Sequence, residues 1–332
     1  MSREFNVAVA GATGAVGVEM LKVLEERNFP VKSLKLLASS RSAGKTMTFK
    51  GETLTIEELT HDSFEGIDIA LFSAGGGRSI EFAPSAVKAG AVVIDNSSAF
   101  RMDDEVPLIV PEVNPEAVSQ HKGIIANPNC TTIIMLVALK PLHDISPIKR
   151  IVVSTYQSAS GAGAAAMQEL EEQTADLLEG KDVVPKVLQH QIAFNIFSHN
   201  SEIQENGYCE EEMKMVHETH KILGDDSIQI CPTCVRVPIP RAHSEAITIE
   251  QETKVSVADA TEAINNAPGV YLMDDRQENI FPMPIDVSGK YDVAVGRIRD
   301  DISHANGLAL FCSGDQLLKG AALNAVQIAE LL

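Results

Sequence analysis

The first third of the chain alternates between two hydrophobic patterns. Short apolar runs, which are typical of buried strands, occur at residues 5–10, 34–38, 67–72 and 91–95. Between them, residues 15–27 and 79–89 carry apolar side chains at the spacing of an amphipathic helix. Strands and helices that alternate in this way predict a mostly parallel sheet with helices on its faces.

The pattern changes after residue 130. Apolar and polar residues alternate at residues 148–157, 228–237, 246–255 and 291–298, as in strands with one exposed face. A last strand at residues 307–312 precedes a predicted amphipathic helix at residues 315–332. The second half therefore predicts a mixed sheet with helices packed on one face.

Composition narrows the class of protein. The 332 residues are 45% hydrophobic and carry a formal net charge of −19, so phosphates of nucleic acid or of an anionic membrane would be repelled. No segment has the length of a leader or of a membrane span, and we expect a cytoplasmic protein. Five unevenly spaced cysteines fit a reducing compartment.

One cysteine pair has the spacing of half a zinc site or of a redox pair. It is the segment Cys231-Pro232-Thr233-Cys234. No second cysteine or histidine pair follows at a suitable distance, so the sequence predicts no metal.

Glycines follow the first predicted strand. Gly11, Gly14 and Gly17 lie between that strand and the first helix. Glycines let the backbone approach a pyrophosphate closely, and the N–H groups at the helix start bind its negative charge. This turn predicts a dinucleotide-binding domain.

The end of the second strand distinguishes between the two nicotinamide cofactors. An NAD site usually has an acidic residue at this place, which holds a ribose hydroxyl. Here the chain reads Ser39-Ser40-Arg41-Ser42, and hydroxyls with a guanidinium suit a 2′-phosphate better. NADP is therefore favoured over NAD, although an ordinary polar loop has the same composition.

A reactive cysteine is predicted at a helix start. Residues 124–126 read as a short strand, Asn127-Pro128-Asn129 favour a turn, and the apolar run 133–139 suits a buried helix. Unpaired N–H groups and the helix dipole would favour a thiolate at Cys130. The alternative is that Cys130 only packs as a small apolar residue.

Together these patterns predict an α/β protein of two domains. Residues 1–128, joined by the C-terminal segment 313–332, would form a Rossmann-type NADP-binding domain. Residues 129–312 would form a mixed-sheet α+β catalytic and dimerisation domain.

Four segments in both halves resemble aspartate-β-semialdehyde dehydrogenases. They are residues 11–17, 127–132, 156–163 and 236–244, the last reading Arg-Val-Pro-Ile-Pro-Arg-Ala-His-Ser. The likeness runs through essentially the whole chain. It implies an NADP-dependent enzyme that interconverts aspartate semialdehyde plus phosphate and aspartyl phosphate, in the pathway to lysine, threonine, methionine and isoleucine.

The resemblance also implies roles for individual residues. Cys130 would be the nucleophile, positioned by Asn129, and His243 the general acid and base. Gln157 would orient the substrate, Arg236 would bind its α-carboxylate, and Glu211 would bind its amino group. Phosphate would be bound by Arg101 and Lys214. The implied cofactor contacts are Thr13, Gly14, Ala15, Val16, Arg41, Ser42, Ser160, Gly161, Gln316 and Asn324.

Three of these residues also have a simpler structural explanation. Arg101, directly after a strand edge, is by its type more often a surface residue. Glu211 and Lys214 lie in or beside a run of three glutamates, where a slip by one residue is possible and a solvated helix face has the same composition.

Other functions remain open at this point. An N-acetylglutamyl phosphate reductase would use the same fold and thiol chemistry, but its acetylated substrate has no ammonium group for Glu211. A glyceraldehyde-3-phosphate dehydrogenase shares the Cys-Thr-Thr run but not the surrounding motifs. A non-catalytic NADP-binding sensor is the third alternative. The resemblance implies a homodimer or a tetramer, with only small molecules and phosphate as other partners.

Overall fold

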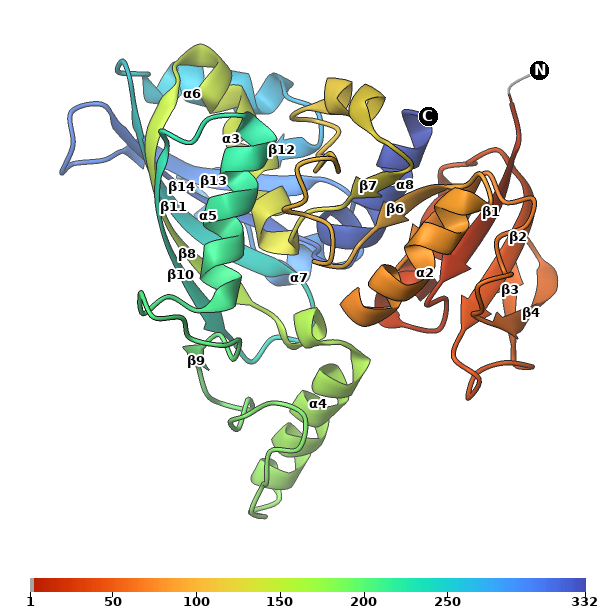
Figure 1. The fold of residues 1–332 in the computed structure, drawn as a ribbon. Helices are drawn as coiled ribbons and strands as arrows, with labels where there is room; N and C mark the ends of the chain where they lie inside the picture. Colours follow the sequence, from red (N-terminus) through yellow and green to blue (C-terminus); the bar gives the residue numbers. More distant parts are fainter. Residues whose placement is uncertain (1–2) are drawn as a thin grey trace. The chain divides into compact units, whose positions relative to one another are not determined.

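A computed structural model describes residues 3–332 (Figure 1). The chain forms two compact units. The first contains Met1–Asn129 and Ala321–Leu332, and the second contains Cys130–Gly320. Each unit has its own seven-stranded sheet.

The sheet of the first unit has the strand order β3-β4-β2-β1-β5-β6-β7. All neighbours pair in parallel except β3 and β4, which form a hairpin. The strands are β1 (Phe5–Ala10), β2 (Val31–Ala38), β3 (Thr46–Phe49), β4 (Glu52–Glu58), β5 (Ile69–Phe72), β6 (Val92–Asp95) and β7 (Ile124–Ala126). The chain leaves β1 between its two neighbours β2 and β5, which is where ligands bind in open sheets of this kind.

Helices cover this sheet because its strands are apolar on both faces. They are α1 (Ala15–Glu26), α2 (Gly76–Lys88), the short η1 (Pro115–Gln120) and α8 (Leu323–Glu330). The C-terminal helix α8 packs on α1, and Arg27 forms a two-pronged ion pair with Glu330, at 2.6 Å and 2.7 Å. The last residues of the chain therefore complete the unit that the first residues begin.

The second unit has the strand order β12-β13-β14-β11-β8-β10-β9. The pairs β8–β10 and β12–β13 are parallel, and the other neighbours are antiparallel. The strands are β8 (Ile148–Gln157), β9 (Phe197–Ser198), β10 (Gln229–Arg236), β11 (His243–Gln251), β12 (Val270–Leu272), β13 (Val293–Asp300) and β14 (Gly307–Gly314). This mixed sheet confirms the predicted fold class.

One face of the second sheet is covered by α3 (Cys130–Ile145), which contacts both α5 (Glu210–Leu223) and α6 (Val257–Asn266). In Figure 1, α5 runs alongside α3 and lies over β8 and β10. Residues of α3 are buried almost throughout, as expected for a helix that is apolar on all sides. On β11, buried side chains alternate with half-exposed ones, so the opposite face of the sheet is only partly covered.

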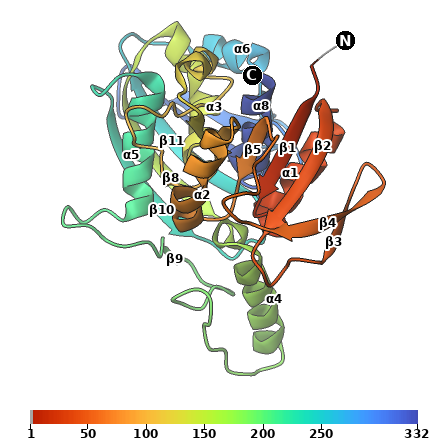
Figure 2. The same cartoon turned by 45° about the vertical axis from the view of Figure 1, so that its right-hand side comes forward.

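A helical excursion leaves the second sheet after the short turn η2 (Ala159–Ala162). It consists of α4 (Ala164–Leu178) and the segment that returns to β9, and it projects from the sheet in both views (Figures 1 and 2). Two buried side chains of α4 hold the returning segment. The Glu169 carboxylate accepts three backbone N–H groups, from residues 186–188, and Gln173 accepts those of Ile192 and Ala193.

Among the element boundaries that differ from the sequence prediction, those of two elements have a clear physical reason. The strand predicted at 246–255 is β11 at residues 243–251, because Gln251 turns inward to donate to the carbonyls of Leu142 and Ser146. The helix predicted from residue 315 begins later, with the π-helical turn η3 (Leu318–Ala322). Its start is delayed because the Asp315 carboxylate accepts the N–H groups of residues 317 and 318.

Several elements had no counterpart in the prediction, among them the hairpin β3–β4 and the helix α6. The hairpin β3–β4 turns at Lys50 and Gly51, which both have positive φ, at 47° and 80°. The helix α6 begins at Ser256, whose side chain accepts the Asp259 N–H. Residues 158–163, between β8 and α4, contain the 3-10 turn η2, and the small helix α7 (Pro284–Val287) packs against β14.

Candidate active site

The glycine turn of the first unit is built for close backbone approach. At Gly11 φ is 89°, and a Cβ there would lie 2.3 Å from the Ser73 carbonyl oxygen. A Cβ at Gly17 would lie 2.2 Å from the Gly11 oxygen, so neither position tolerates a side chain. Ala15 and Val16 open α1, and its N-cap Gly14 makes no side-chain cap, which leaves the first N–H groups for a ligand.

A pocket of about 460 Å³ opens on this turn. It is lined by Gly11, Thr13, Gly14, Ala38, Ser39, Arg41, Ser42, Lys45, Ser73, Ala74 and Arg78. Four of the predicted cofactor residues therefore share one pocket, namely Thr13, Gly14, Arg41 and Ser42. The three cations Arg41, Lys45 and Arg78 form no ion pair within residues 3–332, which suits a ligand with several negative charges.

Arg101 lies in the first unit but is not a surface residue. It is 8% exposed, and its guanidinium donates to the carbonyl oxygens of Asn127 at 2.9 Å and Asn96 at 3.0 Å. These carbonyls follow the ends of β7 and β6. The arginine thus joins two strand ends at the edge where β-α units bind ligands, and its role toward phosphate stays a prediction.

Asn324 on α8 also reaches this edge. Its amide nitrogen donates to the Asn127 side-chain oxygen at 2.7 Å and to the Ile109 carbonyl at 2.9 Å. It is fully buried, so in the first unit it supports the segment that leads to Asn129 and Cys130. Its predicted contact with the cofactor is untested.

Cys130 is the first residue of α3, as predicted from the turn before it. Its side chain is half-buried, and it packs against Gly320, where a Cβ would lie 2.7 Å from that of Cys130. Only glycine at position 320 leaves room for this thiol. Cys130 is close enough to Arg236 to raise the pKa of that guanidinium, although burial lowers it more.

His243 lies at the start of β11 with its ring fully buried. Its Nδ1 accepts the Ser158 backbone N–H at 3.0 Å, so in the neutral ring the proton is on Nε2. Nε2 has no hydrogen-bond partner among residues 3–332. Burial first and the charge of Arg236 second lower the pKa of His243 to about 3, which keeps the ring uncharged near pH 7.

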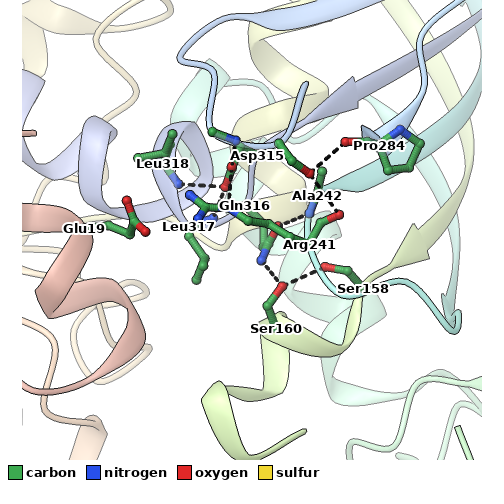
Figure 3. A network of polar contacts seen from close by, with 12 residues as sticks. Glu19, Ser158, Ser160, Arg241, Ala242, Pro284, Asp315, Gln316, Leu317 and Leu318 are labelled. Atoms are coloured by element: carbon green, nitrogen blue, oxygen red, sulfur yellow. Dashed lines mark hydrogen bonds and ion pairs between the residues drawn. The ribbon is translucent and has the colours of Figure 1, made fainter. Parts of the chain in front are cut away.

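The backbone before His243 is strained. Ala242 has a φ of 72°, which is unfavourable for a residue with a Cβ. Its N–H donates to the Gln316 side-chain oxygen at 2.7 Å, and Gln316 donates in turn to Ser160 (Figure 3). Ser160 Oγ lies 3.0 Å from Ser158 Oγ. Gln316 therefore links the loop before His243 to the loop after β8, and both its predicted cofactor role and that of Ser160 stay predictions.

A second anchor of the same loop is Asp315. Its carboxylate accepts the Arg241 Nε–H at 2.6 Å (Figure 3). It also accepts the Gly289 N–H at 2.6 Å. Because Asp315 is fully buried, these contacts fix Arg241 and with it the approach to His243.

Arg236, at the end of β10, is 2% exposed and lies opposite Gln157 in the parallel pair β8–β10. Its Nη1 donates to the Ser158 carbonyl at 2.7 Å, and its Nη2 lies 2.8 Å from His199 Nε2. Its Nε is buried without a hydrogen-bond partner in the described chain. A Cβ at Gly161 would lie 3.1 Å from Nη1 and 3.2 Å from His243 Nε2, so both side chains meet over this glycine.

Glu211 and Lys214 lie one turn apart on α5. Lys214 Nζ is 3.5 Å from the Glu211 carboxylate and 3.1 Å from that of Glu210. Glu211 is 6% exposed, whereas Glu210 faces solvent, so the buried member of the glutamate run is the one predicted to bind the substrate. The charges of both Glu211 and Lys214 influence the pKa of His199, so they belong to the same neighbourhood.

The structure thus gathers nine of the predicted residues in the second unit. They are Cys130, Gln157, Ser160, Glu211, Lys214, Arg236, His243 and Gln316, together with Gly161. The remaining predicted residues, including Arg101, Asn129 and Asn324, lie in the first unit.

Sequence reasoning missed several side chains that shape these sites. Lys45 and Arg78 line the nucleotide pocket, and His199 and Ser158 contact Arg236 and His243. Lys45 comes four residues after Arg41, and Arg78 follows the strand end at Ser73. Polar residues at these strand ends were the available signal for both.

Cys231 and Cys234 do not form a pair. Three residues apart on the strand β10, they fall on opposite faces, with Cys231 exposed and Cys234 buried. Burial raises the pKa of Cys234 above its usual range. Within residues 3–332 we find no cluster of three or more metal-ligating side chains and no helix long and apolar enough to span a membrane.

The nucleotide pocket and the helix-terminal thiol together define a two-domain semialdehyde dehydrogenase. A family model for the NAD binding domain of semialdehyde dehydrogenases matches residues 6–121, and one for their dimerisation domain matches residues 139–319. The chain belongs to the aspartate-semialdehyde dehydrogenase family. It is 60% identical to the aspartate-semialdehyde dehydrogenase of Synechocystis sp. over 332 residues, which covers all of this chain and 98% of that relative.

Other relatives agree. The aspartate-semialdehyde dehydrogenase of Bacillus subtilis is 51% identical over 340 residues, covering 100% of this chain and 98% of the relative. The structure of aspartate semialdehyde dehydrogenase II from Vibrio cholerae, complexed with ASA, has a TM-score of 0.97 at 50% identity, covering 100% of this chain and 98% of that one. A Candida albicans enzyme with NADP, at 24% identity and a TM-score of 0.76, shares the fold, with 99% of this chain and 98% of that one covered.

Proposed function

We propose that this enzyme oxidises L-aspartate 4-semialdehyde with NADP and phosphate to L-4-aspartyl phosphate, and catalyses the reverse reduction. The observation that supports this most directly is the grouping of a helix-terminal thiol with a buried arginine and an uncharged histidine whose Nε2–H has no partner among residues 3–332. Full-length relatives with this enzyme's name support the substrate.

The thiol chemistry begins at Cys130. Its thiolate would attack the aldehyde carbon, so that a C–S bond forms and the carbonyl π electrons move to oxygen. His243 Nε2–H is a donor beside the unpartnered edge of Arg236, and it would hydrogen-bond that oxygen as negative charge develops. This hydrogen bond would stabilise the alkoxide of the thiohemiacetal, and Nε2 would keep its proton throughout the step.

Oxidation follows from the same arrangement. When bound, NADP supplies the hydride acceptor. As the hydride leaves the carbon with its electron pair, the alkoxide oxygen would re-form the C=O bond as a thioester on Cys130, while His243 Nε2–H stays hydrogen-bonded to that oxygen. A phosphate oxygen would then attack the thioester carbon, the C–S bond would break, and the Cys130 thiolate would be restored.

The substrate would be held by charges of matching sign. Arg236 would bind the α-carboxylate through Nε and a neighbouring N–H, Glu211 would bind the ammonium group, and Gln157 would orient the intermediate. Glu211 disfavours an acetylated substrate, which has no ammonium group. Arg101 and Lys214 remain the proposed phosphate ligands.

The first unit would hold the dinucleotide. The glycine turn suits a pyrophosphate, and Arg41 with Ser42 would bind the 2′-phosphate that distinguishes NADP. Three cations without ion pairs in the described chain fit this doubly charged group better than they fit a ribose hydroxyl. Ala15 and Val16 would contribute backbone N–H groups from the start of α1.

We further propose a homodimer formed through the open face of the second sheet. On this face Tyr156 of β8 is 37% exposed and lies 6.3 Å from the ring of Phe311 on β14. An apolar groove of about 430 Å³ continues the face, with Phe281 and Met283 among its lining residues. A second copy of the chain would cover these side chains, and the dimerisation-domain match supports this.

We also propose a cytoplasmic location, which fits five cysteines without a disulfide.

One assay tests the activity. Purified enzyme is mixed with aspartate semialdehyde, phosphate and NADP, and the absorbance of NADPH is followed. Phosphate-dependent NADPH formation is the expected result. Binding of NADP without turnover of any aldehyde would instead identify a non-catalytic sensor, and turnover of N-acetylglutamate semialdehyde in preference would identify the other reductase.

A further inference from the structure

His199 contacts the arginine that is proposed to bind the substrate carboxylate. It follows β9, and its backbone N–H donates to the Cys234 carbonyl at 2.9 Å, which places the ring beside Arg236. His199 Nε2 and Arg236 Nη2 are 2.8 Å apart. A guanidinium has only donors, so the histidine must be the acceptor and its Nε2 must carry no proton.

The other ring nitrogen is then the protonated one. His199 Nδ1 lies 3.1 Å from Ser201 Oγ, to which it would donate. Ser201 Oγ also accepts the Glu211 backbone N–H at 3.0 Å. A continuous chain of contacts therefore runs from Arg236 through His199 and Ser201 to Glu211, and it joins the two residues proposed to bind the two charged groups of the substrate. The Ser201 backbone N–H also points to Nδ1, at 3.2 Å. The Arg236 contact is shorter and admits only an acceptor at Nε2, so it decides the tautomer.

The chemical nature of this acceptor matters. Buried arginines usually pair with a carboxylate, which neutralises their charge as well as orienting them. Arg236 is instead held by two uncharged acceptors, the Ser158 carbonyl and the His199 ring. Both orient the guanidinium, and neither competes with a carboxylate ligand for its positive charge.

We infer that His199 is a positioning residue that orients Arg236 as a neutral acceptor and so preserves its full charge for the α-carboxylate of the substrate. This inference rests on the proposed role of Arg236. The charged and titratable groups that face the His199 ring are Arg236, Lys214, Glu211, Glu212 and His243. Burial lowers the pKa of His199 to about 4, and Arg236 and Lys214 lower it too, against the opposing effect of Glu211 and Glu212, so the ring stays an acceptor near pH 7.

Three substitutions separate orientation from charge. His199→Gln keeps a neutral acceptor, His199→Ala removes it, and His199→Glu replaces it with an anion that would neutralise Arg236. For aspartate semialdehyde we expect kcat/KM to stay within about threefold of wild type for Gln, to fall about tenfold for Ala and about 100-fold for Glu. A merely structural contact predicts a different order, because Glu also accepts from arginine and would be tolerated like Gln.

A second aldehyde isolates the carboxylate. 3-Aminopropanal lacks the α-carboxylate of aspartate semialdehyde, so its turnover does not use Arg236. We expect its kcat/KM to be the same within about twofold in all three variants, because only the site for the carboxylate changes. His190→Ala is the matched control. His190 is exposed in the segment between α4 and β9, and its ring contacts Phe197 rather than Arg236.

The outcomes are distinct. The inference would be overturned if His199→Glu had the same kcat/KM for aspartate semialdehyde as His199→Gln. It would also be overturned if the variants lost activity equally with both aldehydes. If the wild-type enzyme turned over neither aldehyde, the proposed function itself would fail. If Ala or Glu did not fold, as shown by circular dichroism, ¹⁵N NMR of the wild-type ring at pH 7 would decide. We expect a proton on Nδ1 of His199, and a proton on Nε2 would overturn the inference.

Discussion

The two arginine sites of this enzyme treat an anionic ligand in different ways. In the nucleotide pocket of the first unit, Arg41 lies beside Lys45 and Arg78 without an ion pair in the described chain. In the second unit, Arg236 is 2% exposed and is held by the Ser158 carbonyl and His199. The cations of the first site can adjust their positions to the ligand. In the second site, two contacts hold the guanidinium of Arg236 in one orientation.

The difference matches what the ligand group proposed for each site requires. A 2′-phosphate lies far from the reacting atoms and contributes affinity, for which several mobile cations suffice. The α-carboxylate belongs to a small molecule whose reacting carbon must meet a thiolate, so its orientation affects the rate directly. Substitutions in the two sites should therefore change different kinetic constants.

The largest expected effect separates chemistry from cofactor binding. Cys130→Ala should lower kcat by at least about 10⁴-fold, because no other side chain forms the thioester. The Kd of NADPH, measured by its fluorescence, should change less than about twofold. Substantial residual turnover would refute Cys130 as the nucleophile, with Cys231→Ala, an exposed cysteine on β10, as the control.

Next in size is the fixed arginine. Arg236→Lys keeps the charge but replaces a two-pronged donor with a mobile point charge. Misplacement of the reacting carbon by about 1 Å costs on the order of 10²-fold, so kcat/KM for aspartate semialdehyde should fall by about that factor. The KM of phosphate should stay constant.

Lys214→Ala is the companion to that substitution. It should raise the KM of phosphate more than that of the aldehyde, because the ammonium of Lys214 is proposed to bind phosphate. If Arg236→Lys weakened phosphate binding selectively, the two anion sites would be interchanged. Initial rates with each substrate varied separately distinguish these results.

A smaller and more selective effect is expected in the nucleotide pocket. Arg41→Ala should weaken NADPH about tenfold and NADH hardly at all, because only NADPH carries the 2′-phosphate. The loss should shrink at high salt, since these cations are accessible to counter-ions. Equal losses for both cofactors would place the 2′-phosphate elsewhere, and Arg78→Ala measured in parallel shows whether the neighbouring cation shares this role.

The smallest expected effect is on stability. Glu245, two residues after His243 on β11, is fully buried, and its carboxyl oxygens have no hydrogen-bond partner within residues 3–332. Burial raises the pKa of this carboxyl well above its ordinary value. The folded protein therefore keeps a proton that the unfolded chain has released above about pH 4.5, and stability falls as the pH rises.

Glu245→Gln removes this titration. Between pH 7.5 and 8.5 the buried histidines are mostly uncharged in both states, so they add little slope there. The variant should gain up to about 1.4 kcal/mol per pH unit relative to wild type, as long as the wild-type carboxyl stays protonated. Chemical unfolding at several pH values measures the difference, and parallel curves would show that Glu245 does not titrate in this range.

Local patterns in the sequence determined much of this protein. The glycine turn, the strand–helix alternation and the cysteine at the start of α3 depend on residues that are neighbours along the chain, so spacing and residue type were enough. The motifs in both halves were also sufficient to predict the family, which the comparisons confirm.

Only the tertiary structure decided which distant side chains support those motifs. His199 meets Arg236 across 37 residues, and Gln316 meets Ser160 across 156, through contacts that no local pattern encodes. Strand pairing brings such residues together, and a shift of one position would turn each side chain to the other face of the sheet. The burial that makes His243 and His199 neutral arises in the same way, because it depends on what packs over the rings and not on the residues beside them in sequence.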